Sequence, residues 1–151
     1  MIHLIDDDTT VHKLVGMYLA GKNQEACCFR SGDEYLRSTE FIKPSIILSD
    51  IVMPGISGPD LVLEIRKQLP FQKIALISSY THFGRAHAAD NQLCYILEKP
   101  LRMGAFVAMI NALIACEDAQ KSEDPSEYFL MCEFGLNHTC PFHESKRLQL
   151  A

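Results

Sequence analysis

The strongest constraint on the fold is an alternation, repeated five times, of a short apolar run with a segment of helical periodicity. The apolar runs cover residues 2–5, 26–29, 46–48, 74–77 and 95–97. The helical segments lie near residues 11–19, 31–36, 61–69, 82–91 and 106–114. Strands that alternate with helices form βαβ units and therefore a parallel sheet. We predict an α/β fold with helices on both faces of the sheet.

Reactive side chains follow four of the five predicted strands. Asp6, Asp7 and Asp8 come after the first strand, and Asp50 comes after the third. The fourth is followed by Ser78 and Ser79, and the fifth by Glu98, Lys99 and Pro100. In parallel sheets the functional site lies beyond the carboxyl ends of the strands. These side chains are therefore expected to meet at one edge of the sheet.

Three of these residues, Asp6, Asp7 and Asp50, form a cluster that needs a counter-charge. Two carboxylates 4 Å apart near a protein surface repel by about 4 kcal/mol. Mg²⁺ would remove this repulsion, because it binds one or two carboxylates together with water and phosphate oxygens. The simpler alternative is that the acids only cap the first helix, whose amino end favours negative charge. We expect that capping role for Asp8.

An ionised aspartate can also attack phosphorus and form an acyl phosphate. A positive side chain and a hydroxyl would then hold the remaining phosphoryl oxygens. Lys99 and Ser78 are positioned for these two tasks. Either residue alone would be an ordinary solvated lysine or strand-end serine, so the prediction depends on their joint placement.

Five sequence segments carry a resemblance to a known family. They are LIDDD at 4–8, SGDEYL at 31–36, IILSDIVMPGISG at 46–58, ISS at 77–79 and EKPL at 98–101. In this order they resemble the receiver domain of two-component response regulators, over about residues 1–116. The resemblance implies a flavodoxin-like, doubly wound sheet of five parallel strands in the order 2-1-3-4-5.

The resemblance also assigns roles within the cluster. Asp50 is implied to be the phosphoacceptor. Asp6, Asp7 and Asp50 are implied to hold Mg²⁺, with the backbone carbonyl of Val52 as a further ligand. Such a domain is not a conventional enzyme, but it catalyses its own phosphorylation and dephosphorylation.

The remaining implied roles concern the response to phosphorylation. Lys99 is implied to pair with the phosphoryl group, the Lys99–Pro100 peptide bond to be cis, and Ser78 to be the switch hydroxyl. The family usually has an aromatic residue three positions before this lysine, where this chain has Ile96. Tyr95 lies one position earlier and should point to the opposite face of the strand. We expect Ile96 to occupy the switch position and to weaken coupling to the surface of the fourth helix.

Charge and hydropathy limit the partners. The formal net charge of −5 argues against a general nucleic-acid surface, and no apolar run is long enough to span a bilayer. The amino end lacks the pattern of a secretory signal, so a cytoplasmic location is expected. The resemblance implies a sensor histidine kinase or phosphotransfer protein as donor, and a downstream protein or output domain as target. A homodimer is a further form of output.

The last part of the chain differs in composition. We divide the sequence into a receiver domain at 1–116, a polar linker at 117–127 and an extension of unknown role at 128–151. In the extension, Cys132, His138, Cys140 and His143 could bind zinc, although their spacing is not that of a standard zinc finger. Packing on the domain or a partner interface is the alternative. The earlier cysteines Cys27, Cys28 and Cys94 are expected to be reduced core residues.

Two other functions remain open at this point. Asp6 to Thr10 fit the D-x-D-x-T motif of haloacid-dehalogenase-like phosphohydrolases, in which Asp6 would be the nucleophile and Asp8 the general acid. A receiver-like adaptor that binds partners without phosphorylation is the second alternative. The acidic residues, Ser78 and Lys99 argue against it, whereas Ile96 leaves it possible. A phosphoryl label on Asp6 would indicate the phosphohydrolase, and a label on Asp50 the receiver. Beryllium fluoride mimics an acyl phosphate, so spectra that do not change when it is added with Mg²⁺ would indicate the adaptor.

Overall fold

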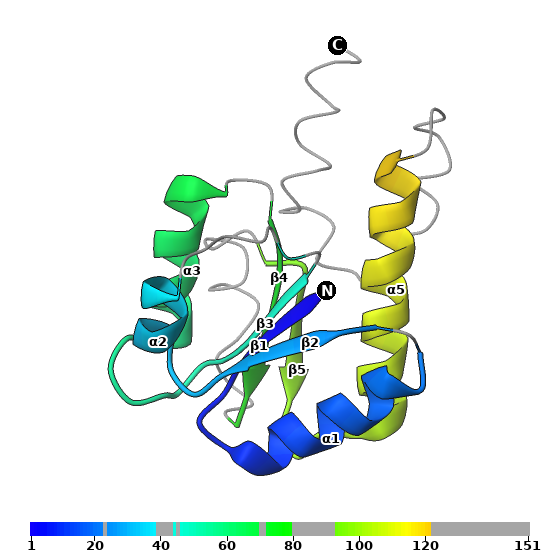
Figure 1. Ribbon diagram of the computed structural model, residues 1–151, viewed down its shortest axis with the longest axis horizontal. Coiled ribbons are helices and arrows are strands. Elements are labelled where there is room, and N and C mark those ends of the chain that lie inside the picture. The colour runs from blue at the N-terminus through cyan, green and yellow to red at the C-terminus, as the bar shows by residue number, and fades with distance from the viewer. Residues whose placement is uncertain (23, 39–43, 45, 70–71, 80–92, 122–151) are drawn as a thin grey trace.

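The protein folds as five parallel strands with helices on both sides (Figure 1). The structure, a computed structural model, describes residues 1–22, 24–38, 44, 46–69, 72–79 and 93–121. Its elements are β1 (Ile2–Ile5), α1 (Thr9–Ala20), β2 (Ala26–Phe29), α2 (Gly32–Arg37), β3 (Ile46–Asp50), α3 (Gly58–Gln68), β4 (Lys73–Ser78), β5 (Tyr95–Glu98) and α5 (Met103–Lys121). The strand order is β2-β1-β3-β4-β5, which confirms the predicted sheet.

The strand register aligns the carboxyl ends of β1, β3, β4 and β5. Ile5 pairs with Ser49, Asp50 with Ile77, and Ser78 with Glu98. Every residue of β1, β3 and β4 is buried, as expected for central strands covered on both faces. The residues that directly follow these strands are therefore held along one edge of a rigid sheet.

Alternation of side chains along the strands divides the core into two layers. Leu4 and Leu48 pack with buried residues of α1 and α5 on one face. Ile5 and Ile47 pack with buried residues of α2 and α3 on the other. Burying such an aliphatic side chain contributes about 1.5–3 kcal/mol. Burial of apolar side chains on both faces therefore fixes the register and, with it, the position of the strand ends.

Short polar side chains begin three of the helices. Asp8 caps α1 by accepting a hydrogen bond from the Thr10 N–H, as predicted. Ser31 caps α2, also as predicted, by accepting from the Glu34 N–H. Ser57 caps α3 in the same way. Each cap fixes the loop that leads from a strand end into its helix.

One prediction about the core is wrong: Cys27 and Cys28 are exposed free thiols. Their strand, β2, lies at the edge of the sheet, so it has a neighbour on one side only. Its burial pattern is intermediate at both ends and exposed in the middle, unlike that of the central strands. Cys94 is partly buried and packs against the α1/α5 layer.

Several predictions lie wholly or partly outside the described residues. These are the helix at 82–91, the possible zinc ligands and the extension at 128–151. Helix α5 runs to Lys121, five positions beyond the domain boundary at 116, so part of the predicted linker is helical. Among the described residues, no helix is both long and apolar enough to cross a membrane.

Candidate functional site

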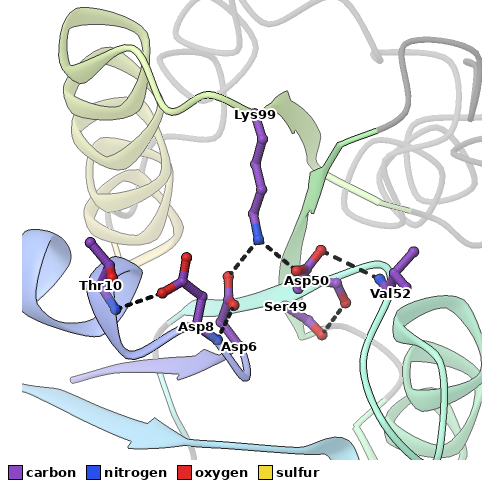
Figure 2. Close-up of polar contacts among 7 residues, drawn as sticks. All are labelled: Asp6, Asp8, Thr10, Ser49, Asp50, Val52 and Lys99. Carbon is purple, nitrogen blue, oxygen red and sulfur yellow. Dashed lines mark hydrogen bonds and ion pairs between the residues drawn. The ribbon is translucent and has the colours of Figure 1, made fainter.

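The site is built around an ammonium group held between two carboxylates at the carboxyl edge of the sheet. Lys99 Nζ lies 2.6 Å from Asp50 Oδ2 and 3.1 Å from Asp6 Oδ2 (Figure 2). Asp6 and Asp50 are buried, and the Lys99 side chain is 19% exposed. Three strands supply this constellation, since Asp6 follows β1, Asp50 ends β3 and Lys99 follows β5. The predicted convergence of these residues is therefore observed.

Asp7 completes a group of three carboxylates with Asp6 and Asp50. One oxygen from each residue lies within 4.8 Å of the other two. Asp6 and Asp50 are buried, whereas Asp7 is exposed. All the donors are hard oxygens, and one side is open to solvent, which fits a hydrated Mg²⁺ better than a soft metal. The residues present thus suit the ion that the sequence predicted.

Burial and charge act against each other in the cluster. Burial raises the pKa of Asp6, although hydrogen bonds from the Asp8 N–H and Lys99 oppose the shift. Repulsion from Asp50 raises this pKa further. Burial alone would lower the pKa of Lys99, but bonds to Asp50 and Asp6 outweigh it and raise the value. Lys99 therefore stays charged, while ionised Asp6 is less stable here than in water.

Asp8 has a different role from its two neighbours. Its carboxylate accepts from the Thr10 N–H at 2.8 Å, and Figure 2 shows it directed toward α1. Its own backbone N–H donates to Asp6 Oδ1 at 2.8 Å. Helix capping therefore occupies the carboxylate that a phosphohydrolase of the D-x-D-x-T type would use as its general acid, which weighs against that alternative.

Ser78 lies beside this group at the end of β4. The residue is buried, and its carbonyl accepts a 2.6 Å hydrogen bond from the Lys99 N–H. The Lys99–Pro100 peptide bond is cis, as the resemblance implied. The backbone thus ties the predicted switch serine to the lysine of the site.

Val52 lies two residues after Asp50 in the sequence and contacts its carboxylate from the side opposite Lys99 (Figure 2). Its N–H donates to Asp50 Oδ1 at 3.4 Å, and the residue is 56% exposed. Asp50 is therefore contacted through both carboxylate oxygens, one by Lys99 and one by the backbone of the following loop (Figure 2).

Tyr95 and Ile96 lie on opposite faces of β5, as predicted. Tyr95 packs against the layer formed with α1 and α5. Ile96 packs against the layer formed with α2 and α3. The residue three positions before Lys99 is thus an aliphatic side chain, and Tyr95 is excluded from that face.

Sequence reasoning missed two residues that shape the loop after Asp50. Asp33 in α2 accepts a hydrogen bond from the Ile56 N–H at 3.2 Å. Gly58 lies so close to β3 that an added Cβ would overlap the Asp50 carbonyl oxygen. The close glycine could have been suspected from MPGISG, but nothing in SGDEYL indicates a contact with residue 56.

Comparison with known proteins decides the family. The model of the response regulator receiver domain matches residues 2–111. The chain belongs to the response regulator receiver domain family. The match includes all the residues of the carboxylate cluster as well as Ser78 and Lys99.

Solved receiver structures show the same fold. A receiver domain protein from Clostridium thermocellum superposes with a TM-score of 0.70 at 23% identity, covering 79% of this chain and 97% of that one. The response regulator TrrA from Thermotoga maritima, in complex with Mg²⁺-BeF, gives a TM-score of 0.66 at 25% identity, covering 74% and 96%.

Curated relatives are longer proteins. The DNA-binding transcriptional regulator NtrC of Salmonella typhimurium is 27% identical over 116 residues, covering 76% of this chain and 25% of the relative. The chain thus spans about a quarter of the length of this relative. The similarity concerns the receiver part of the present chain and not the DNA-binding activity in the relative's name.

Proposed function

We propose that this receiver domain accepts a phosphoryl group on Asp50 from a phosphohistidine donor. The observation that carries the proposal is the 2.6 Å contact between Lys99 Nζ and Asp50 Oδ2 inside a group of three carboxylates. An isolated carboxylate repels an incoming phosphoryl group. The positive charge of Lys99 cancels part of this repulsion, so the Asp50 carboxylate can approach phosphorus.

The transfer would proceed by in-line displacement. An Asp50 carboxylate oxygen forms a bond to phosphorus, and the bond from phosphorus to the donor's imidazole nitrogen breaks. The electron pair of the broken bond goes to that nitrogen, and the ring leaves as neutral imidazole when its other nitrogen carries a proton. Lys99 would then exchange its contact with the Asp50 carboxylate for one with a phosphoryl oxygen. The exchange needs little movement, because the ammonium group lies 2.6 Å from the carboxylate that receives the phosphoryl group.

We further propose that Asp6, Asp7 and Asp50, with the backbone carbonyl of Val52, hold Mg²⁺. The bound ion would supply positive charge that neutralises the carboxylates and the phosphoryl oxygens. The mutual distance of at most 4.8 Å among the three carboxylate groups supports this proposal. The raised pKa of Asp6 is consistent with it, because burial and repulsion from Asp50 disfavour an ionised carboxylate that a bound cation would stabilise.

The switch would use Ser78, which follows Ile77, the residue of β4 that pairs with Asp50. A phosphoryl group favours one of two arrangements only through its different contacts with each. Ser78 would supply one such contact by donating to a phosphoryl oxygen. Ile96 would fill the position of the usual aromatic residue and weaken coupling to the region after β4.

Partners and location are proposed from family membership and charge. The donor would be a sensor histidine kinase or phosphotransfer protein, and the target a downstream protein, an output domain or a second copy. Direct nucleic-acid binding by the receiver is not expected at a net charge of −5. A cytoplasmic location remains our expectation.

The central test is the site of phosphorylation. Wild-type protein should acquire one phosphoryl group from acetyl phosphate with Mg²⁺, and Asp50→Asn should acquire none. Asp60→Asn, which removes an exposed carboxylate of α3, is the matched control and should be labelled like wild type. Labelling of Asp50→Asn would refute the assignment, and a label mapped to Asp6 would instead favour the phosphohydrolase.

A second test separates signalling from the adaptor alternative. Beryllium fluoride with Mg²⁺ imitates an acyl phosphate, so amide NMR signals near Asp50 and Ser78 should shift in wild type. Unchanged spectra would favour an adaptor that acts without phosphorylation.

A further inference from the structure

We propose that Asp33 is a positioning residue for the loop 51–57, and that through this loop it sets the affinity of the pocket for Mg²⁺. The inference rests on the proposed function, because the loop carries the Val52 carbonyl that we assign to the ion. Asp33 lies in the first turn of α2, outside the group formed by Asp6, Asp7 and Asp50.

The evidence begins with the middle of the loop. The Ile56 N–H donates to Asp33 Oδ2 at 3.2 Å, a contact between residues 23 positions apart. The same oxygen lies against Gly55, where an added Cβ would overlap it. Gly55 has φ of +80°, a conformation that other residues rarely adopt. The loop backbone thus turns around the Asp33 carboxylate.

Both ends of the loop are attached elsewhere. At its start, the Ile51 N–H donates to the Ile77 carbonyl at 2.9 Å, which continues the β3–β4 ladder. At its end, the Gly58 N–H donates to the Ile51 carbonyl at 2.9 Å. These bonds close the loop but contact none of residues 53–56. Met53 and Ile56 pack against the apolar layer of α2 and α3, and Asp33 adds a side-chain hydrogen bond to the backbone of this intervening segment.

The carboxylate is itself held in place. Glu34 N–H donates to Ser31 Oγ at 3.1 Å, and Glu34 Oε2 accepts from the Arg30 N–H at 2.6 Å. The two bonds resemble a capping box, except that Glu34 bonds to the N–H of Arg30, one residue before the cap Ser31, and together they fix the first turn of α2. Gly32 allows close contact, because a Cβ there would overlap the Ile56 side chain. The start of α2 and the loop therefore form one packed unit.

Loss of the Asp33 contact would affect Mg²⁺ binding through the backbone carbonyl of Val52. Its N–H contacts Asp50 Oδ1, and its carbonyl lies on the peptide that leads to buried Met53. If residues 55 and 56 lose their anchor, the Val52 carbonyl should sample several directions. Loss of such an outer partner typically costs a metal site about 10–100-fold in affinity. For one loop contact we expect the lower end, about tenfold.

The variants must separate hydrogen bonding from charge. Asp33→Ala removes both, whereas Asp33→Asn removes the charge and keeps an oxygen that can accept from Ile56. Glu64→Ala, on the exposed surface of α3, is the control for loss of one negative charge away from the loop. Mg²⁺ affinity would be measured by calorimetry, and exchange of the Ile56 amide hydrogen by NMR in metal-free protein.

We expect Asp33→Ala to bind Mg²⁺ about tenfold more weakly and to lose protection of the Ile56 amide. Asp33→Asn and Glu64→Ala should remain within about twofold of wild type. Unchanged affinity in Asp33→Ala would overturn the role of Asp33, even if its melting temperature fell. Equal weakening in Asp33→Ala and Asp33→Asn would also overturn it, because charge would then be the cause. Absence of Mg²⁺ binding by wild type would refute the proposed function together with this inference.

Discussion

Lys99 Nζ contacts Asp50 Oδ2 at 2.6 Å and Asp6 Oδ2 at 3.1 Å, so one ammonium group serves two buried carboxylates from different strands. The lysine follows β5, and its aspartate partners lie at the ends of β1 and β3. The contact therefore spans most of the sheet edge. A group that binds here competes with Lys99 for both carboxylates, and removal of the lysine takes away the positive charge that contacts them both.

The first prediction concerns stability without Lys99. Lys99→Ala should lower the free energy of unfolding in EDTA by about 2 kcal/mol, less than the 3–5 kcal/mol for a fully buried pair, because the side chain is partly exposed. Added Mg²⁺ should recover part of this loss by replacing the positive charge. Urea unfolding with and without Mg²⁺ measures both effects.

Lys67→Ala provides the matched control for that variant. Lys67 pairs with Glu64 at 2.6 Å, but both side chains are well exposed. An exposed pair of this kind contributes at most about 1 kcal/mol. Equal losses in the two variants would contradict the special role that we give to the buried contact.

The second prediction concerns the cost of keeping Asp6 ionised. Its pKa is raised in the folded protein, chiefly by burial, so at neutral pH the charged form destabilises the fold. Asp6→Asn should therefore increase the free energy of unfolding in EDTA and abolish stabilisation by Mg²⁺. Thermal unfolding with and without the ion tests this. A lower stability in EDTA would show that the bonds to Asp6 outweigh its burial.

The third prediction compares two glycines. A Cβ at Gly58 would overlap the Asp50 carbonyl oxygen and lie 2.9 Å from Ile51 Cα, so the backbone after the phosphoacceptor must move. Gly58→Ala should cost about 1–3 kcal/mol and reduce the rate of labelling by acetyl phosphate. Gly16→Ala in α1 meets nothing within 4 Å and should stabilise by about 1 kcal/mol. Chemical unfolding of both variants measures the contrast.

Much of the site could be predicted because its residues occupy positions that topology fixes. A parallel sheet brings its carboxyl ends together, so Asp6, Asp50, Ser78 and Lys99 were expected to meet before any coordinates were known. The capping roles of Asp8 and Ser31 were equally predictable, because such residues directly precede a helical pattern. Local rules and strand order were sufficient in these cases.

Other features of the fold and the site depend on long-range contacts, which local sequence patterns do not predict. Asp33 contacts a loop 23 residues away, and the fit depends on how closely α2 approaches α3. Cys27 and Cys28 belong to an apolar run, but their exposure follows from the position of β2 at the sheet edge. A sequence pattern indicates that a strand exists more readily than how well neighbouring helices cover it.

A final long-range contact leads to the fourth prediction. His3 in β1 is buried, and its Nδ1 lies 3.3 Å from the Tyr35 hydroxyl of α2. The rings of Phe29 and Tyr35 flank the imidazole, with centroids 5.5 and 5.6 Å away. Burial lowers the pKa of His3 below its usual 6.5 and raises that of Tyr35 to about 12. Tyr35 thus stays neutral, and within the described part of the chain the side chain of His3 contacts these aromatic rings and not a carboxylate.

The sign of the pH effect follows from these shifts. Between its lowered pKa and 6.5, His3 binds more protons in the unfolded chain than in the folded one. The free energy of unfolding should therefore be highest above pH 6.5 and fall as the pH drops, by at most about 1.4 kcal/mol per pH unit from this group. The raised pKa of Asp6 acts in the opposite direction at lower pH. His3→Leu should remove only the His3 contribution, so the difference between the two pH profiles isolates it. Parallel profiles for wild type and His3→Leu would show that His3 titrates alike in both states.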